Sequence, residues 1–579
     1  MTGCNGRALN IEAVQPVRTD TELPVRPKRI SICKHTNFWV SVCLAAFALL
    51  PCRGLAAAPL HEQVDKLVAA KFAKHPVAAG TDEAEFLRRV WLDFDGGIPS
   101  VSEAKSFLAD KSADKRAKLI ERLMAAPRFP ERMADAFNIH LMERRGDDAR
   151  WREYLVEAFK ANKPWDQLAR EIVAPEFLDE KKRAAGWFIT RRLDKVGQQD
   201  TDYPGLTRDV GRLFLGVDLQ CAQCHRHLFI KDYKQVDFNG LFVAFQNTKL
   251  NPAGGDYKTP WVSEAPLTNK YAFVSVLSSV KGETAPRVPF GTEVSLPDLK
   301  GDDLWIEKPD RKRNFPGAPK FSPLKELSRA IASKDNPWFT RNAVNRVWFL
   351  MMGRGLVEPL DLHHSENPPS HPELLDPLAK EFAAREFDLR WLIRELALTQ
   401  TYQRSTRVPA GANNLPENLF LVAKERHLSF EQVLRAFLQA TGEWERVSAG
   451  KAEGLPAGEK FYKLAEFETA FRAALANAPT EPEYDVNPTL RAALFFRNSD
   501  HVLWALKPRA DNLVERAAKL SDPAQVADEL HFAILTRPAT DAEKSSVARW
   551  LEKHGADRAK AIGHYAWALL SSTEFFTNH

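Results

Sequence analysis

Apolar residues recur at spacings of three and four along most of the chain beyond residue 57. Phe86, Leu87, Val90 and Trp91 follow this spacing in the first half, and residues 391–398 follow it in the second. Such spacing places the apolar side chains on one face of a helix, which then packs against a core. The pattern therefore predicts a mainly α-helical protein.

Short polar signals mark where several of these helices should begin. Serine or threonine is followed three residues later by glutamate at Ser100, Ser370 and Thr540. In a capping box the hydroxyl accepts from the third backbone N–H of the helix, while the carboxylate returns to the cap. The sequence thus predicts helix starts at these three positions, with a structural role for the Ser370 block.

Residues 250–320 differ from the helical pattern because they are rich in proline and glycine. Residues 271–277 alternate apolar and polar positions and include β-branched residues, as half-buried strands do. We therefore expect two helical domains, 58–249 and 321–579, with a small, partly β insertion or linker between them.

The first 57 residues predict export. The apolar run 38–50 follows several basic residues and precedes the small residues Ala56 and Ala57, which is the order of a secretory signal peptide with a long basic n-region. The run is shorter than the roughly 20 residues that span a bilayer. We expect a periplasmic or cell-surface protein with no integral membrane span after cleavage.

The charge balance argues against nucleic acid as a partner. The formal net charge is +5, and residues 1–57 carry seven Lys or Arg against three Asp or Glu. Four of the five excess positive charges therefore belong to the predicted signal peptide. A nearly neutral remainder provides no general attraction for nucleic acid.

A C-x-x-C-H motif is the most specific chemical signal. Four of the six cysteines lie within residues 1–52, which leaves only Cys221 and Cys224, followed directly by His225. This is the attachment signature of c-type haem, in which both thiols bind the porphyrin and the histidine is the proximal ligand of the iron. Export agrees with this assignment, because such thiols function outside the reducing cytoplasm.

Two other uses of the cysteines remain open. They form a disulfide, or they bind zinc with His225 or His227 and a distant ligand such as His371. His227 lies two residues beyond His225 and so about 200° around a helix. It is better placed as a hydrogen-bonding neighbour than as a second ligand of the same haem.

The sixth iron ligand would decide the chemistry of such a haem, since methionine raises its potential and an open position admits small molecules. The spacing selects none of the candidates, which are Met124, Met133, His140, Met142, Met351, Met352, His363, His364 and His371.

A polar cluster within a helical pattern offers a possible anion site. Its members are Arg341, Asn342, Asn345, Arg346, Trp348 and Arg354. Guanidinium groups bind carboxylates in a bidentate manner, so the cluster suits haem propionates or another anionic ligand. Buried structural networks use the same residue types.

Several blocks together resemble one two-domain family. In the first domain, blocks 88–93, 97–99, 162–166 and 214–225 resemble the planctomycete-type cytochrome domain. In the second domain, blocks 336–337, 345–348, 353–357, 367–375 and 572–579 resemble the domain that usually follows it. The resemblance implies haem binding, while the activity of these domains is generally given as unknown. Relatives carry an acidic residue where this chain has Arg226.

Three functions follow from these observations. The first is an exported haem c protein that exchanges electrons with a redox partner during oxidation of external substrates. The second is a haem or metal enzyme with a cleft between its helical domains. The third is a non-enzymatic binding or scaffold protein whose cysteines form a disulfide or hold zinc. No nucleophile elbow, phosphate loop, dinucleotide fingerprint or H-E-x-x-H motif is present.

Overall fold

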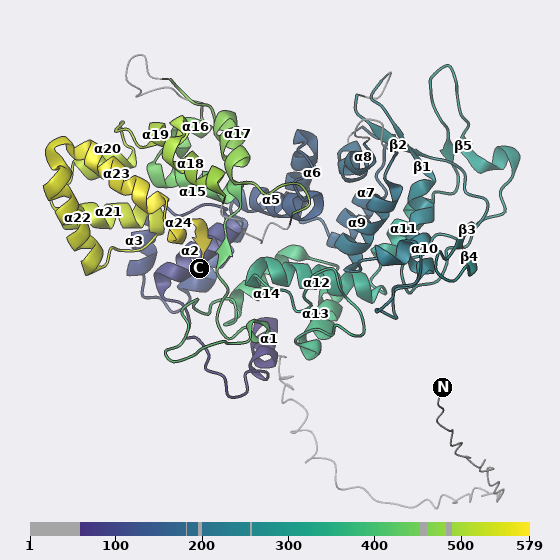
Figure 1. The fold of residues 1–579 in the computed structure, drawn as a ribbon, viewed down its shortest axis with the longest axis horizontal. Coiled ribbons are helices and arrows are strands. Elements are labelled where there is room, and N and C mark those ends of the chain that lie inside the picture. The colour runs from purple at the N-terminus through teal and green to yellow at the C-terminus, as the bar shows by residue number, and fades with distance from the viewer. Residues whose placement is uncertain (1–57, 181, 195–199, 255–257, 451–459, 482–488) are drawn as a thin grey trace, which may run out of the picture. The chain divides into compact units, whose positions relative to one another are not determined.

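The computed structural model describes residues 58–180, 182–194, 200–254, 258–450, 460–481 and 489–579 (Figure 1). These residues are mainly helical and form only small two-stranded sheets, which confirms the predicted fold class. None of the helices within these ranges combines the length and apolarity needed to cross a membrane. The predicted signal peptide, 1–57, lies outside the described residues.

The N-terminal part is a series of short amphipathic helices. Ser100 and Glu103 form the predicted capping box of α3. Asp82 caps α2 by accepting from two backbone N–H groups of the first turn. The helices are α1 (Leu60–Ala69), α2 (Glu83–Phe94), α3 (Val101–Ala109), α4 (Lys115–Ala125), α5 (Arg128–Met142), α6 (Ala149–Lys160), α7 (Trp165–Val173), α8 (Trp187–Leu193), α9 (Tyr203–Leu215) and α10 (Gln235–Gln246).

The middle of the chain contains three antiparallel strand pairs. They are β1 (Thr248–Asn251) with β2 (Trp261–Glu264), β3 (Tyr271–Val274) with β4 (Lys281–Thr284), and β5 (Trp305–Glu307) with β6 (Ala318–Pro319). The strand predicted within residues 271–277 is therefore confirmed over its first four residues. Its remaining residues form the turn that leads to β4.

Helices resume after the strand pairs and continue to the end of the chain. They are α11 (Pro323–Ile331), α12 (Pro337–Met352), α13 (Pro372–Ala384), α14 (Leu389–Leu398), α15 (Phe430–Thr441), α16 (Trp444–Ser448), α17 (Leu464–Leu475), α18 (Leu490–Asn498), α19 (Asp500–Ala505), α20 (Leu513–Ala518), α21 (Pro523–Leu535), α22 (Asp541–His554), α23 (Arg558–Leu570) and α24 (Thr573–Phe576). A fourth strand pair joins β7 (Arg426–His427) to β8 (Thr577–Asn578).

The other two predicted capping boxes have different outcomes. Thr540 and Glu543 form the expected box at the start of α22. The box predicted at Ser370 is wrong, because α13 begins one residue later and His371 occupies the cap position without a side-chain cap bond. The hydroxyl of Ser370 instead lies 3.0 Å from His371 Nδ1.

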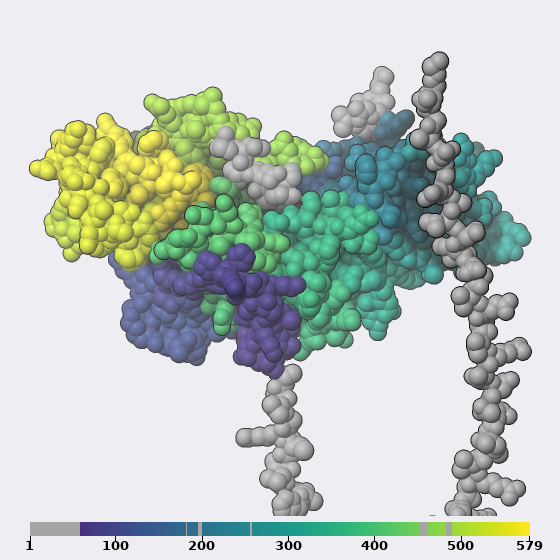
Figure 2. Space-filling model, turned by 60° about the horizontal axis from the view of Figure 1, so that its bottom comes forward, coloured from purple at the N-terminus to yellow at the C-terminus, as the bar shows by residue number. Residues whose placement is uncertain are grey.

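The hydrophobic core divides at a different place from the predicted insertion. One buried cluster extends from Val64 to Phe420, with Phe532 added, and a second is formed mainly between Phe430 and Phe575. In the first cluster α12 packs on α9, α13 and α14 (Figure 1), and α1 lies against α13 and α14, as the purple N-terminal residues show in Figure 2. Helices from both sides of residues 250–320 therefore share one core, and this places α9 and α12 side by side.

Candidate functional site

The approach to the C-x-x-C-H motif is fixed by the C-terminal half of the chain. Helix α9 ends at Gly216, whose positive φ of 69° favours glycine. The backbone then runs antiparallel to residues 361–363: His363 donates to the Gly216 carbonyl at 2.9 Å, and Asp218 donates to the Asp361 carbonyl at 2.9 Å. The motif is thus held in place by residues about 140 positions later.

The motif forms a single 3-10 turn, Cys221–Gln223. Ala222 is fully buried and anchors the turn. The side chain of Gln235 donates to the Cys224 carbonyl at 3.0 Å. Both thiols are free and exposed, so they are accessible for covalent attachment.

His225 has the tautomer that a proximal iron ligand requires. Its Nδ1 lies 2.6 Å from the backbone carbonyl of Arg226. Since a carbonyl oxygen only accepts, Nδ1 carries the proton and Nε2 keeps its lone pair. Metal-binding histidines are usually oriented by such a bond. In this chain the backbone carbonyl of Arg226 orients the ring.

His227 stabilises the turn that follows the motif. Its Nδ1 accepts from the backbone N–H groups of Phe229 at 3.2 Å and Ile230 at 2.9 Å. Its own N–H donates to the Tyr233 carbonyl at 2.9 Å. Burial lowers the pKa of His227. The charge of Asp218 raises this pKa, and His364 and His225 lower it further. His227 therefore makes its hydrogen bonds within its own turn.

An exposed apolar surface surrounds the motif. Phe229 is 80 % exposed and Leu228 63 %, and the loop between β3 and β4 adds the exposed Val276, Leu277 and Val280. The loop is joined to the motif because Val276 donates to the Cys224 carbonyl at 3.0 Å. Exposed apolar patches of this kind mark binding surfaces. The free thiols, the His225 tautomer and this surface fit a c-type haem.

Zinc finds less support in the arrangement of the side chains. Within the described ranges, no three His, Cys, Asp or Glu side chains converge on one point in a way that could hold a metal ion. His371 is buried at the start of α13, with its ring 5.6 Å from that of Phe420. Burial, supported by Lys71, lowers its pKa to about 4.

The structure separates Arg341, Asn345 and Arg346, which are three of the six residues in the predicted polar cluster. Arg341 forms a bidentate ion pair with Asp376 on α13, at 2.6 and 2.8 Å. Asn345 is fully buried and pairs with both backbone groups of Val357 at 2.9 Å, so it braces the following loop. Arg346 alone of the three lines a cavity.

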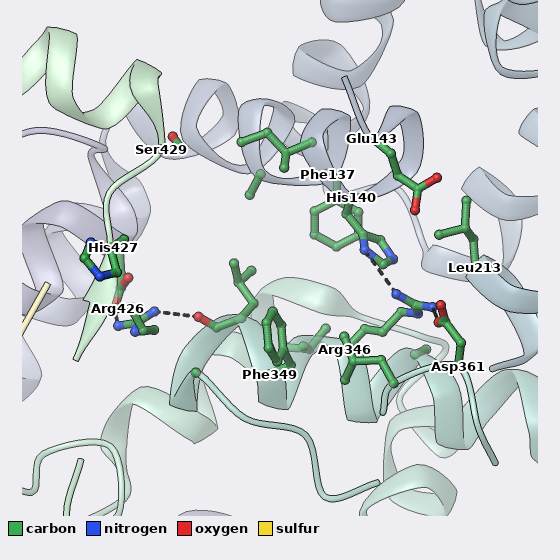
Figure 3. Close-up of a pocket in the computed structure, with 18 of the residues that line it drawn as sticks. Phe137, His140, Glu143, Leu213, Arg346, Phe349, Asp361, Arg426, His427 and Ser429 are labelled. Atoms are coloured by element: carbon green, nitrogen blue, oxygen red, sulfur yellow. Dashed lines mark hydrogen bonds and ion pairs between the residues drawn. The ribbon is translucent and has the colours of Figure 1, made fainter. Parts of the chain in front are cut away.

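This cavity is the second candidate site and has a volume of about 560 Å³ (Figure 3). Its lining comes from both halves of the chain, and it includes apolar residues such as Ala136, Phe137, Phe349 and Leu360 alongside charged groups. Exposed residues, among them Lys424, belong to the lining, so the cavity reaches solvent. Its size lies in the range typical of small-molecule sites.

Arg346 lies at the centre of the charged part of the cavity. Figure 3 shows it between His140 and Asp361, and it forms an ion pair with Asp361. It also donates to the Arg212 carbonyl at 2.7 Å and to Asn342 Oδ1 at 3.0 Å. Burial lowers the pKa of Arg346, and Asp361 opposes this effect. A buried guanidinium with these partners is fixed in one position.

Arg212, on α9, completes this charged group. It makes a bidentate pair with Glu143 at 2.7 and 2.8 Å, and it contacts Asp209 at 3.0 Å and Asp361 at 3.1 Å. Burial alone would lower its pKa, but these carboxylates hold it above the ordinary value. Asp361 joins Arg212 and Arg346, and its backbone also holds the approach to the motif.

His140, one of the predicted sixth-ligand candidates, lines the cavity, whereas Cys221, Cys224 and His225 do not. Its Nδ1 lies 3.3 Å from an Arg346 nitrogen. Burial, with Arg346 and Arg212, lowers the pKa of His140 well below its ordinary value. The sequence offered His140 only as one of several candidate sixth ligands, because neither the cavity nor its partners could be seen in the spacing.

Sequence reasoning missed Arg132, Arg212 and Asp361. One signal was present on α5, where Arg132, Ala136 and His140 recur every four residues and so share a helix face. Arg132 and His140, with the small Ala136 between them, therefore interrupt an otherwise apolar face of α5, and this interruption could have indicated a polar site. No comparable signal links Arg212 to Asp361, which lies 149 positions later.

Two family models match the chain. Residues 63–250 match the model described as PSCyt2, protein of unknown function (DUF1549), and residues 324–551 match the model described as PSD1, protein of unknown function (DUF1553). Searches of curated proteins and of solved structures found no match. The first match contains the C-x-x-C-H turn, and the cavity is lined by residues of both matches.

Proposed function

Because the chain belongs to the family in which a PSCyt2 domain is followed by a PSD1 domain, we propose that it is an exported c-type haem protein that transfers electrons. The order of the two matches confirms the predicted resemblance to the planctomycete cytochrome-type pair. Both descriptions give the function as unknown. The proposal therefore depends on the chemistry of the residues themselves.

The observation that carries the proposal is the state of the C-x-x-C-H turn. Its two thiols are free and exposed, and His225 keeps a lone pair on Nε2 because Nδ1 donates to the Arg226 carbonyl. Cys221 and Cys224 would attach the haem, and His225 would hold its iron. The bound haem would supply one-electron redox chemistry. The exposed apolar residues Phe229 and Val276 would cover part of its surface.

Location supports the same function. The apolar run 38–50 with its basic n-region predicts transport out of the cytoplasm, where a pair of exposed thiols would otherwise stay reduced and unmodified. We expect the protein in the periplasm or at the cell surface, where a redox partner could reach the exposed motif.

The test is expression of the full chain, with its own leader, in cells that carry a haem c maturation system. We expect a Soret band, a pyridine haemochrome spectrum of the c type and haem that stays bound after denaturation. The absence of all three would overturn the proposal. Two titratable thiols and no iron would point instead to a binding or scaffold protein.

A second candidate function is favoured by the cavity. It is large enough for an organic molecule and combines apolar walls with the charged group around Arg346. An enzyme would use such a space for its substrate. None of the motif residues lines the cavity, and electron transfer remains the first proposal. A haem spectrum insensitive to cyanide, carbon monoxide and peroxide would argue against the enzyme.

A further inference from the structure

A buried arginine in the cavity has no hydrogen-bond or ion-pair partner among the described residues. Arg132 lies on α5, is only 6 % exposed and lines the cavity. Within the part of the chain that the structure describes, it makes no hydrogen bond and no ion pair, and its Nε is completely buried without an acceptor. An unpaired buried charge costs much free energy, so proteins normally pair it or place it against a ligand.

The carboxylates that act on Arg132 are already bound by other residues. The carboxylates that act on Arg132 most strongly are Asp93, Asp135 and Glu431, and each of them raises its pKa against the effect of burial. Asp93 accepts from the Tyr402 hydroxyl at 2.7 Å and from Arg426 at 2.7 Å.

The other two carboxylates are similarly engaged. Asp135 accepts two bonds from Arg152, at 3.1 and 3.0 Å, and Glu431 accepts two from Arg144, at 2.5 and 3.0 Å. None of these three carboxylates therefore makes a hydrogen bond or an ion pair with Arg132, although their charges favour its protonated form. Burial lowers the pKa of Arg132, yet a guanidinium stays protonated at neutral pH.

A second donor in the same cavity also has no acceptor. The guanidinium of Arg346 has only donors, so the contact at 3.3 Å makes His140 Nδ1 the acceptor. The proton of the neutral ring is then on Nε2. This nitrogen is buried and has no hydrogen-bond partner among the described residues. His140 lies two turns from Arg132 along α5 and lines the same cavity.

We propose that the cavity binds a small organic anion whose oxyanion group, a carboxylate or a sulfate ester, is held by Arg132 with His140 as a further donor. The uncharged part of the ligand contacts the apolar walls that include Ala136, Phe137 and Leu360. A guanidinium binds either oxyanion through two parallel bonds. A cavity of about 560 Å³ exceeds what a single inorganic ion needs, which favours an organic body.

This proposal is independent of haem attachment, because none of the motif residues lines the cavity. The test therefore uses the full mature chain in two forms, with haem and as the Cys221→Ser/Cys224→Ser variant. Isothermal titration calorimetry with benzoate, phenyl sulfate, inorganic sulfate and neutral benzyl alcohol distinguishes the ligand chemistries. We expect benzoate or phenyl sulfate to bind both forms more tightly than inorganic sulfate or benzyl alcohol.

Substitution of Arg132 separates recognition from structure. Arg132→Met keeps an unbranched apolar stem and removes the charge, and we expect the affinity for the bound anion to fall about 10- to 100-fold. Arg341→Met is the matched control, since Arg341 lies outside the cavity and pairs with Asp376. The Arg341→Met variant should bind the anion as tightly as the wild type does. Arg132→Lys keeps the charge without the planar fork and should bind with intermediate affinity.

The stability of the ligand-free variants provides a second reading. Removing an unpaired buried charge should leave the unfolding temperature of Arg132→Met equal to or above that of the wild type. Arg192→Met should lower it, because Arg192 is buried and paired with Asp209 at 2.7 Å.

Several results would overturn the proposal. They are binding of none of the anions, equal affinity for benzyl alcohol and the anions, or unchanged anion affinity in Arg132→Met. A loss of stability in Arg132→Met as large as that in Arg192→Met would likewise show that Arg132 is a structural cation. If Arg132→Met does not fold, Arg132→Lys replaces it in the test, and wild-type affinity of Arg132→Lys for the anion would also overturn the proposal.

Discussion

The C-x-x-C-H turn and the cavity are built in opposite ways. The turn consists of consecutive residues, is exposed and is held mainly by backbone bonds, as between Val276 and the Cys224 carbonyl. The cavity is lined by Arg132, Arg212 and Asp361, which come from separate segments of the chain. Arg212 and Asp361 form an ion pair, whereas Arg132 faces the cavity. A site that receives a cofactor covalently must be accessible, whereas a charge that recognises an organic anion acts more strongly when folding has partly removed it from water.

The two regions nevertheless share a support. Residues 361–363 pair with residues 216–218, so Asp361 holds the approach to the motif with its backbone and two cavity arginines with its side chain. The comparison therefore predicts that changes in the motif leave the fold intact. Changes at Asp361 or around Gly216 should instead affect stability.

The largest expected effect is on haem. Cys221→Ser/Cys224→Ser should abolish covalent haem completely, because both thioether bonds are lost. The free energy of unfolding of the apoprotein should change by no more than about 0.5 kcal/mol, since both thiols are exposed. Haemochrome spectra and urea unfolding of the haem-free proteins measure the two quantities. A large loss of stability would show that the turn is part of the core structure.

The next effect tests the charged part of the cavity. Asp361→Asn removes the carboxylate shared by Arg212 and Arg346 and should cost about 3 kcal/mol. Asp376→Asn is the matched control, because Asp376 pairs with Arg341 at a half-exposed position and should cost less than about 1 kcal/mol. Equilibrium unfolding in urea compares them. Equal costs would remove the distinction between a buried network and a surface pair.

The third effect concerns pH. Burial, with Arg346 and Arg341, lowers the pKa of His363 to about 3. The unfolded chain binds a proton near pH 6.5, while the folded chain does not, so stability is complete above that pH and falls as the pH decreases toward 3. The loss is up to about 1.4 kcal/mol per pH unit for this group.

His363→Gln isolates this contribution. Unfolding free energies at pH 7.5, 5.5 and 4.5 should show a shallower acid loss in the variant than in the wild type. His371, with a pKa lowered to about 4, should behave similarly and serves as a replicate at the start of α13. If the wild type, His363→Gln and His371→Gln lost stability in parallel as the pH falls, the burial of neutral imidazoles would be contradicted.

The smallest effect tests the junction of the two regions. Gly216→Ala introduces a Cβ that would lie 2.6 Å from His363 Cδ2 at a φ of +69°, and we expect a loss of about 2 kcal/mol. Gly301→Ala is the control, since Gly301 also has a positive φ of 52° but no atom within 4 Å of the new Cβ. It should cost about 1 kcal/mol. Thermal unfolding compares the two, and an equal cost would show that Gly216 makes no close approach.

Local sequence patterns determined the helical fold, the strand at residue 271 and the capping boxes at Ser100 and Thr540. The Ser370 box failed because α13 begins at Pro372, a residue suited to the first helical position, and His371 therefore takes the cap position. Local patterns are reliable where a residue interacts with partners three or four positions away.

The sequence by itself also determined the chemistry of Cys221, Cys224 and His225, because consecutive residues carry that signal. Only the tertiary structure decided that Arg346 belongs to a cavity and Arg341 to the surface, although both lie on α12. It alone also showed that Arg132 is buried without a partner. The reason is physical: the free energy of a buried charge depends on groups brought close by folding, and their distance along the chain does not record it.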